Sequence, residues 1–217
     1  MNKSTLNLDT DPRPHIRDLG LKHYQAVWDD MRKFNEQRTD ATADEIWLVQ
    51  HPPVFTLGLN GKAEHIIDAH DIPIINCDRG GQVTYHGPGQ LVAYILMDLQ
   101  RRHWGVKKLV NQIEQVIIDL LKDYSITADR KHNAPGVYVD GAKIAALGLR
   151  VRRGCSYHGL SLNVDMDLTP FSYINPCGFE GLASTQMNAY DPAIDIHEVK
   201  SRLIDHLDNQ LMQKQDS

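Results

Sequence analysis

Cysteine is scarce in this chain of 217 residues, which has only Cys77, Cys155 and Cys177. An odd number without a C-x-x-C motif argues against a disulfide framework and fits a reducing compartment. Cys77 and Cys155 adjoin predicted strands and are expected to be small buried hydrophobes. No apolar run approaches the roughly 20 residues of a membrane helix, and residues 1–14 lack the apolar core of a signal peptide. We therefore expect a cytoplasmic protein with no membrane contact.

Basic residues do not dominate, because 23 lysines and arginines face 28 aspartates and glutamates, for a formal net charge of −5. That balance argues against general nucleic-acid binding, which needs a positive surface. The 11 histidines form no H-x-x-x-H or H-E-x-x-H motif, so a metal site is not expected. No P-loop is present, and no G-x-G-x-x-G sequence follows a predicted strand. We expect no metal and no cofactor.

Hydrophobic periodicity predicts helices at residues 19–38, 106–122 and 194–211. Short apolar runs between the helices predict strands at residues 45–50, 54–57, 72–75, 91–97 and 155–165. Asp140-Gly141 between two apolar runs predicts a hairpin. This order indicates an α+β fold with an antiparallel or mixed sheet and helices packed on one side. We expect one domain over residues 1–217, with residues 1–14 as a loosely held arm.

One glycine-rich stretch, residues 79–90, reads Arg-Gly-Gly-Gln-Val-Thr-Tyr-His-Gly-Pro-Gly-Gln. Glycine permits positive φ and a close approach of the backbone to a ligand, and polar side chains surround these glycines. The apolar run that follows predicts a buried strand, which would hold the turn on a rigid scaffold. The turn is either a ligand site or an ordinary hairpin loop.

Cys177 and Lys143 are the candidates for chemistry. Cys177 lies between a proline and a glycine, which excludes a helix interior and leaves the thiol on a loop. Such a thiol is a nucleophile if its pKa is lowered, and a lysine ammonium beside it favours the thiolate. Lys143 precedes small and apolar residues, so another group can approach it, although a lysine near a turn is usually a surface residue. His86 and His158, each between a tyrosine and a glycine, are either general bases, hydrogen-bonding groups or structural residues.

Four segments in this order resemble the lipoyl(octanoyl) transferase family of the biotin and lipoate protein ligase superfamily. They are residues 79–90, 135–148, 158–163 and 176–178, which together span about half of the chain. The resemblance implies an α+β fold with a bent mixed or antiparallel sheet flanked by helices. It also implies transfer of an octanoyl group from octanoyl-acyl carrier protein to a lysine, the first step of endogenous protein lipoylation. The implied acceptors are lipoyl domains of 2-oxoacid dehydrogenase complexes and the H protein of glycine cleavage.

The resemblance also assigns roles to individual residues. Cys177 matches the nucleophile that forms an acyl-thioester intermediate, and Lys143 matches the lysine that lowers the pKa of that thiol. Alanine is common in the family where this chain has Ser161, a departure with no expected consequence because backbone contacts dominate there. The positions that match acyl-substrate-binding residues are Arg79, Gly80, Gly81, Gln82, Val83, Thr84, Tyr85, His86, Ala146, Leu147, Gly148, Gly159, Leu160 and Ser161.

Two other interpretations remain open. An ATP-dependent lipoate or biotin ligase would share the glycine-rich turn and a lysine like Lys143, but such enzymes form an adenylate and need no cysteine. A non-catalytic protein that binds acyl carrier protein or lipoyl domains would use the same surfaces without turnover. Because the implied partners are small acidic proteins, a local basic patch is expected on this acidic chain. The candidates are residues 101–102, 107–108 and 150–153.

Overall fold

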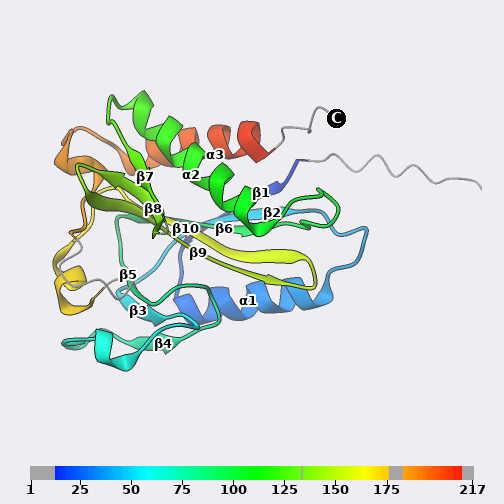
Figure 1. Cartoon of the computed structure of the whole chain (residues 1–217), viewed down its shortest axis with the longest axis horizontal. Helices are drawn as coiled ribbons and strands as arrows, with labels where there is room; N and C mark the ends of the chain where they lie inside the picture. Colours follow the sequence, from blue (N-terminus) through cyan, green and yellow to red (C-terminus); the bar gives the residue numbers. More distant parts are fainter. Residues whose placement is uncertain (1–12, 133, 176–182, 212–217) are drawn as a thin grey trace, which may run out of the picture.

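The computed structural model describes residues 13–132, 134–175 and 183–211. Within these residues, three α-helices surround a seven-stranded sheet and a three-stranded sheet (Figure 1). The strand orders are β1-β2-β6-β10-β9-β8-β7 and β4-β3-β5. The helices are α1 (Tyr24–Gln37), α2 (Val106–Asp123) and α3 (Ile196–Leu211). The strands are β1 (His15–Leu21), β2 (Glu45–Gln50), β3 (Val54–Leu57), β4 (Ile74–Asn76), β5 (Val83–His86), β6 (Gln90–Leu96), β7 (Asp129–Lys131), β8 (Ala134–Val139), β9 (Ala142–Arg152) and β10 (Cys155–Asn163).

The larger sheet is mixed, as predicted. β1 is parallel to β2, and all other neighbouring strands in this sheet are antiparallel. The sequence did not predict β1, because residues 19–21 were assigned to the first helix. Leu21 instead pairs with Gln50, and the N–H of Lys22 donates to the Gln50 carbonyl at 3.0 Å. Pairing with β2 therefore overrides the helical periodicity, and α1 begins only at Tyr24.

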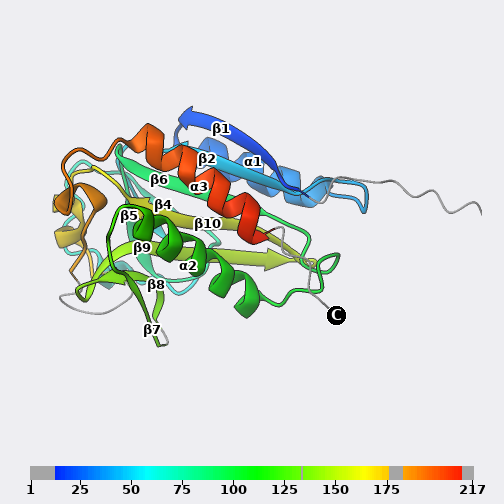
Figure 2. The same ribbon diagram turned by 90° about the horizontal axis from the view of Figure 1, so that it is seen from above.

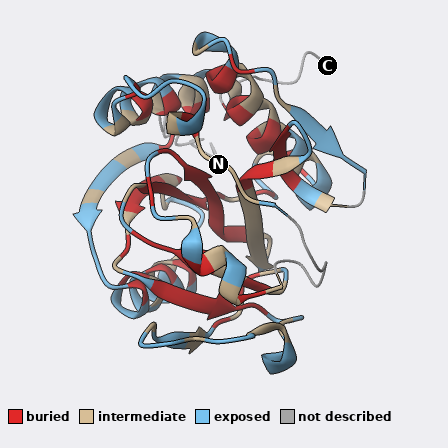
Figure 3. Ribbon diagram, turned by 90° about the vertical axis from the view of Figure 1, so that its left-hand side faces the viewer, coloured by how far each residue is buried: buried red, intermediate tan, exposed pale blue. Residues whose placement is uncertain are grey.

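Both faces of the seven-stranded sheet are covered (Figures 1 and 2). Along β6, Leu91, Ala93 and Ile95 lie in the core that includes α2 and α3. The alternate residues Val92, Tyr94 and Leu96 pack in a second core with α1, because successive side chains of a strand point to opposite faces. The expectation that all helices pack on one side is therefore wrong for α1. Figure 3 shows buried residues concentrated in the strands between these layers.

Helix α2 forms where the sequence predicted it. Its buried residues recur at helical spacing and make one stripe against the sheet. Each of the larger apolar side chains in that stripe contributes about 1.5–3 kcal/mol by leaving water. The stripe comprises Leu109, Ile113, Val116, Ile117, Leu120 and Leu121. Among the described helices, none is both long enough and apolar enough to cross a bilayer.

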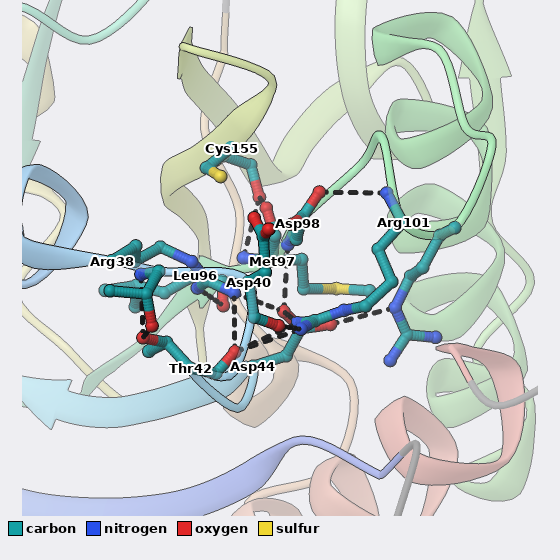
Figure 4. A network of polar contacts seen from close by, with 12 residues as sticks. Arg38, Asp40, Thr42, Asp44, Leu96, Met97, Asp98, Arg101 and Cys155 are labelled. Carbon is teal, nitrogen blue, oxygen red and sulfur yellow. Dashed lines mark hydrogen bonds and ion pairs between the residues drawn. The ribbon is translucent and has the colours of Figure 1, made fainter. Parts of the chain in front are cut away.

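A buried carboxylate, Asp44, ties the start of β2 to the loop after β6 (Figure 4). It accepts hydrogen bonds from Arg38 at 2.6 Å, Arg101 at 2.7 Å and Arg102 at 2.9 Å, and from the backbone N–H of Asp98 at 2.8 Å. Its side chain is 4% exposed, so these partners offset the cost of removing its charge from water. Residues 101 and 102, candidates for a docking patch, are thus engaged with Asp44.

Candidate active site

A pocket lies between the seven-stranded sheet and the layer formed by α1 and the three-stranded sheet. One wall is the backbone of β9 from Lys143 to Gly148 together with β10 from His158 to Ser161, and the opposite side comes from α1, the glycine-rich stretch and β5. Together with its open mouth the pocket encloses about 770 Å³. Segments far apart in the sequence thus line one pocket.

All but two of the binding residues predicted from the sequence line this pocket. They are Arg79, Gly81, Gln82, Val83, Thr84, His86, Ala146, Leu147, Gly148, Gly159, Leu160 and Ser161. Gly80 instead packs on β9, and Tyr85 packs between Phe55 and Phe171. The three predicted segments therefore meet in space, whereas the role of each residue in substrate binding stays a prediction.

Two glycines in neighbouring strands explain how the segments come together. A Cβ on Gly159 would lie 2.0 Å from the carbonyl oxygen of Ala93, so only glycine lets β10 approach β6 there. A Cβ on Gly148 would lie 3.1 Å from the Gly80 carbonyl oxygen. The N–H of Gly80 donates to the Leu149 carbonyl at 3.0 Å, so the glycine-rich turn closes one end of the pocket against β9.

Arg79 holds this turn in shape. Its Nε and one terminal nitrogen donate to Thr56 Oγ1 at 3.1 and 2.9 Å, and that nitrogen also donates to the carbonyls of Thr56 and Gln82 at 2.6 and 2.7 Å. The other terminal nitrogen donates to the Gly80 carbonyl at 2.9 Å. The guanidinium is thus surrounded by oxygens of its own turn and of β3.

A β-bulge turns Lys143 toward the pocket. Tyr138 pairs with Lys143 and Val137 pairs with Ala145, so Ile144 is an extra residue in β9. Ile144 and Ala145 both lie in the core that includes α2, and the side-chain alternation is reset between them. Lys143 therefore shares the pocket with Ala146 and Gly148 rather than pointing into the helix-facing core.

Lys143 is 7% exposed and pairs with Ser184 in a parallel β-bridge. Its Nζ donates to the Pro135 carbonyl at 3.4 Å and lies 5.3 Å from the centre of the Tyr138 ring. Its backbone N–H donates to the Ala183 carbonyl at 2.8 Å, and its carbonyl accepts from the N–H of Thr185 at 3.0 Å. Cys177, the predicted nucleophile, lies outside the described residues, so its relation to Lys143 stays a prediction. The other two cysteines, Cys77 and Cys155, are free and buried, as predicted.

A buried chain of polar side chains, which no sequence motif indicated, leads to Lys143. Gln90 Nε2 donates to Asn163 Oδ1 at 2.9 Å, and Asn163 Nδ2 donates to the Thr185 carbonyl at 2.9 Å. The Gln90 amide oxygen is 2.7 Å from His86 Nδ1, so this ring nitrogen carries the proton and donates. Gln90 is the first residue of β6, and Asn163 is the last residue of β10. A polar residue that directly adjoins an apolar run is the sequence signal that could have identified both.

Three histidines around the pocket are neutral near pH 7. His51 donates from Nδ1 to the Lys22 carbonyl at 2.6 Å and accepts at Nε2 from the Tyr94 hydroxyl at 2.7 Å. Burial lowers the pKa of His51 to about 4 and the pKa of His86 to about 3. Burial also lowers the pKa of His158, and its hydrogen bond to a carboxylate only partly opposes that shift.

The fold, with its pocket on the inner face of a mixed sheet, is that of the lipoate and biotin protein ligases. The structure is similar to lipoate-protein ligase A bound with ATP, with a TM-score of 0.77 and 14% identity over 92% of this chain and 85% of that chain. It is also similar to biotin protein ligase from Aquifex aeolicus in complex with biotin and ATP, with a TM-score of 0.59 and 12% identity over 94% and 73% of the two chains. At these identities the likeness establishes the fold alone.

The chain belongs to the lipoyl protein ligase A/B catalytic domain family, whose model matches residues 23–208. An octanoyltransferase from Pseudomonas entomophila (strain L48) is 59% identical over 89% of this chain and 92% of its own length. An octanoyltransferase from Pseudomonas syringae pv. syringae (strain B728a) is 58% identical over 89% and 90% of the two chains. The family predicted from the four motifs is therefore confirmed.

Proposed function

We propose that this enzyme transfers an octanoyl group from octanoyl-acyl carrier protein to a specific lysine of lipoyl domains, as the first step of endogenous lipoylation. The observation that carries the proposal is the identity of 58–59% to octanoyltransferases across 89% of the chain. The acceptors would be lipoyl domains of 2-oxoacid dehydrogenase complexes and the H protein of glycine cleavage. The cytoplasm is the proposed place of action, since it keeps a catalytic thiol reduced.

The pocket supports an acyl substrate. Apolar side chains of Val83, Val92, Leu147 and Leu160 line it, and Lys143 lies toward one end of its β9 wall. An acyl chain would be buried along the strands, and its carbonyl would lie near the lysine. Apolar pockets with a few polar groups that orient the ligand are typical of such sites.

The proposed reaction is a double displacement through Cys177. The Cys177 thiolate attacks the thioester carbonyl of octanoyl-acyl carrier protein, the carrier leaves as a thiolate that takes up a proton, and an octanoyl-Cys177 thioester remains. The ε-amine of the acceptor lysine then attacks that thioester, which gives an amide and frees Cys177. The Lys143 ammonium stabilises the Cys177 thiolate by charge and gives its proton to the departing carrier thiolate. Lys143, now neutral, receives the proton that the attacking amine loses, which restores the starting pair. Conversion of a thioester to an amide drives the reaction, so ATP is not consumed.

ATP-dependent ligation is the nearer alternative, because structures of the same fold bind ATP. The test incubates the protein with a lipoyl domain and supplies either octanoyl-acyl carrier protein or free octanoate with ATP. Octanoylated lipoyl domain from the thioester without ATP is expected. Modification only with octanoate and ATP would show that the protein is a ligase and not a transferase. No modification under either condition would favour a non-catalytic binding protein.

A further inference from the structure

His158 brings an unpaired hydrogen-bond acceptor to the pocket. Its Nε2 lies 2.9 Å from Asp78 Oδ1, and its Nδ1 is buried without a partner in the described structure. Asp78 also accepts hydrogen bonds from Trp28 Nε1 at 2.8 Å and from the Tyr157 hydroxyl. A carboxylate held by these donors takes the proton-bearing nitrogen of the imidazole, so Nε2 carries the hydrogen and Nδ1 carries the lone pair.

A second unpaired acceptor lies on the same pocket. Gln82 Oε1 is buried and has no hydrogen-bond partner among the described residues, and Gln82 lines the pocket with His158. The backbone of Gln82 is fixed, because its carbonyl accepts from Arg79. An unpaired buried acceptor costs free energy, and a site with such groups binds water or another donor. These two acceptors therefore differ from the other polar groups of the pocket in that neither has a hydrogen-bond donor among the described residues.

The strand register places His158 at the end of the pocket that lies away from Lys143. His158 pairs with Leu149, whose carbonyl accepts from the N–H of Gly80 where the glycine-rich turn closes on β9. Lys143 lies five residues before Gly148 on the same strand, and the bulge at Ile144 takes up one of these residues. The four remaining steps of ~3.4 Å separate the two residues by about 14 Å. An acyl chain whose carbonyl is near Lys143 thus points toward His158.

We propose that His158 and Gln82 make the closed end of the pocket a hydrated, polar stop that limits the length of the acyl chain. This inference rests on the proposed function, because it concerns the acyl substrate of the same site. An octanoyl chain ends before the stop and leaves the water in place. A longer apolar chain displaces that water and presses a methyl group against Nδ1 and Oε1, which then lose their hydrogen bonds.

The test measures kcat/KM for octanoyl-, decanoyl- and dodecanoyl-acyl carrier protein with a lipoyl domain as acceptor. His158→Phe keeps a ring of similar size, and Gln82→Met keeps the length of the side chain, so neither variant simply lengthens the pocket. In each variant the ratio of decanoyl to octanoyl kcat/KM is expected to rise about tenfold, because the longer chain no longer takes water away from a buried acceptor. An unchanged ratio in both variants would overturn the proposal.

Tyr157→Phe is the matched control. The substitution removes another hydrogen-bond donor to Asp78, and Tyr157 does not line the pocket. The dependence of kcat/KM on acyl length should therefore match that of the wild type. A shift equal to that of His158→Phe would mean that disturbance of the Asp78 cluster, rather than polarity, sets the preference.

An acyl chain that ends in a hydrogen-bond donor should be transferred faster than the same chain without the donor. The wild type should transfer 10-hydroxydecanoyl faster than decanoyl groups, because the hydroxyl can bond to the stop, and His158→Phe should lose this advantage. If the wild type transfers octanoyl groups but prefers decanoyl over its hydroxylated form, only the polar stop is wrong. If the wild type transfers no octanoyl group, the proposed function itself fails.

Discussion

The side-chain amide of Asn163 donates a hydrogen bond to the backbone carbonyl of Thr185 at 2.9 Å. The N–H of Thr185 in turn donates to the carbonyl of Lys143 at 3.0 Å, so Asn163 fixes the chain segment that runs beside the proposed catalytic lysine. Gln90 holds the Asn163 amide from the other side. Asn163 also lines the pocket, and these hydrogen bonds give it a positioning role that acts through Thr185.

Replacement of Asn163 should slow turnover. Asn163→Leu removes the donor to the Thr185 carbonyl and one of the two acceptors of the buried Gln90 amide, a loss of about 1–3 kcal/mol. We expect kcat for octanoyl transfer to fall about tenfold, with KM for octanoyl-acyl carrier protein nearly unchanged. Thr185→Ala is the control, because Asn163 contacts only the backbone of Thr185. Equal losses in both variants, or a loss confined to KM, would contradict the positioning role.

Lys143→Met should nearly abolish transfer while the protein stays folded. Methionine has a similar length, but it cannot stabilise a thiolate or move a proton, and such general acid–base groups contribute about 10²–10⁴-fold to the rate. Lys131→Met is the matched control, because Lys131 also contacts the Tyr138 ring, at 4.4 Å, yet is exposed and lies outside the pocket. Activity of Lys143→Met within threefold of Lys131→Met would remove Lys143 from the mechanism.

Asp44→Asn should destabilise the fold strongly. The variant leaves Arg38, Arg101 and Arg102 around a neutral amide, and breaking a buried ion pair costs about 3–5 kcal/mol. Asp40→Asn in the same loop is exposed and should change the free energy of unfolding by less than about 0.5 kcal/mol. Urea unfolding of the two variants measures this difference. Similar midpoints would mean that the Asp44 cluster contributes little to the free energy of unfolding.

The Asp44 cluster also predicts acid sensitivity. Burial alone would raise the pKa of Asp44, but the hydrogen bonds from Asp98 and Arg102 and the charge of Arg101 lower it overall. A lowered pKa in the folded state stabilises the fold above the usual aspartate value of about 3.9, and that contribution is lost as the pH falls below it. The free energy of unfolding of Asp44→Asn should therefore fall less than that of the wild type between pH 5 and pH 3.

Buried histidines should make the fold less stable at mildly acidic pH. The pKa of His51 is about 4 when folded and about 6.5 when unfolded, so the unfolded state takes up more protons as the pH falls below 6.5. Between pH 7 and pH 5 this costs up to about 2 kcal/mol. His51→Leu should lose that part of the pH dependence. Tyr94→Phe, which removes a hydrogen bond to the same ring but leaves it titratable, should keep it, and an unchanged slope in His51→Leu would contradict the assignment.

Local sequence signals predicted the elements that carry their own pattern. The apolar stripe of α2, the Asp140-Gly141 hairpin and the buried run of β6 were all located within a residue or two. β1 and β7 were missed because their residues are mostly exposed and are held by pairing with β2 and β8, which no local periodicity records.

Sequence motifs predicted which segments form the candidate site, but they could not predict features that depend on the register between strands. The glycine-rich stretch, β9 and β10 meet as the motifs suggested. The bulge at Ile144 depends on how two strands align, so the sequence alone could not show which way Lys143 points. The unpaired Nδ1 of His158 likewise depends on Asp78, which lies 80 residues away in the chain.

Cys177 is the residue on which the proposed double displacement depends. Intact-protein mass spectrometry after incubation with octanoyl-acyl carrier protein, without an acceptor, should show one octanoyl group on the wild type and none on Cys177→Ala. Cys155→Ala should still be acylated, because burial raises the pKa of the Cys155 thiol and makes it a poor nucleophile. Transfer to a lipoyl domain by Cys177→Ala at the wild-type rate, with no acylated intermediate on either protein, would contradict the acyl-enzyme route.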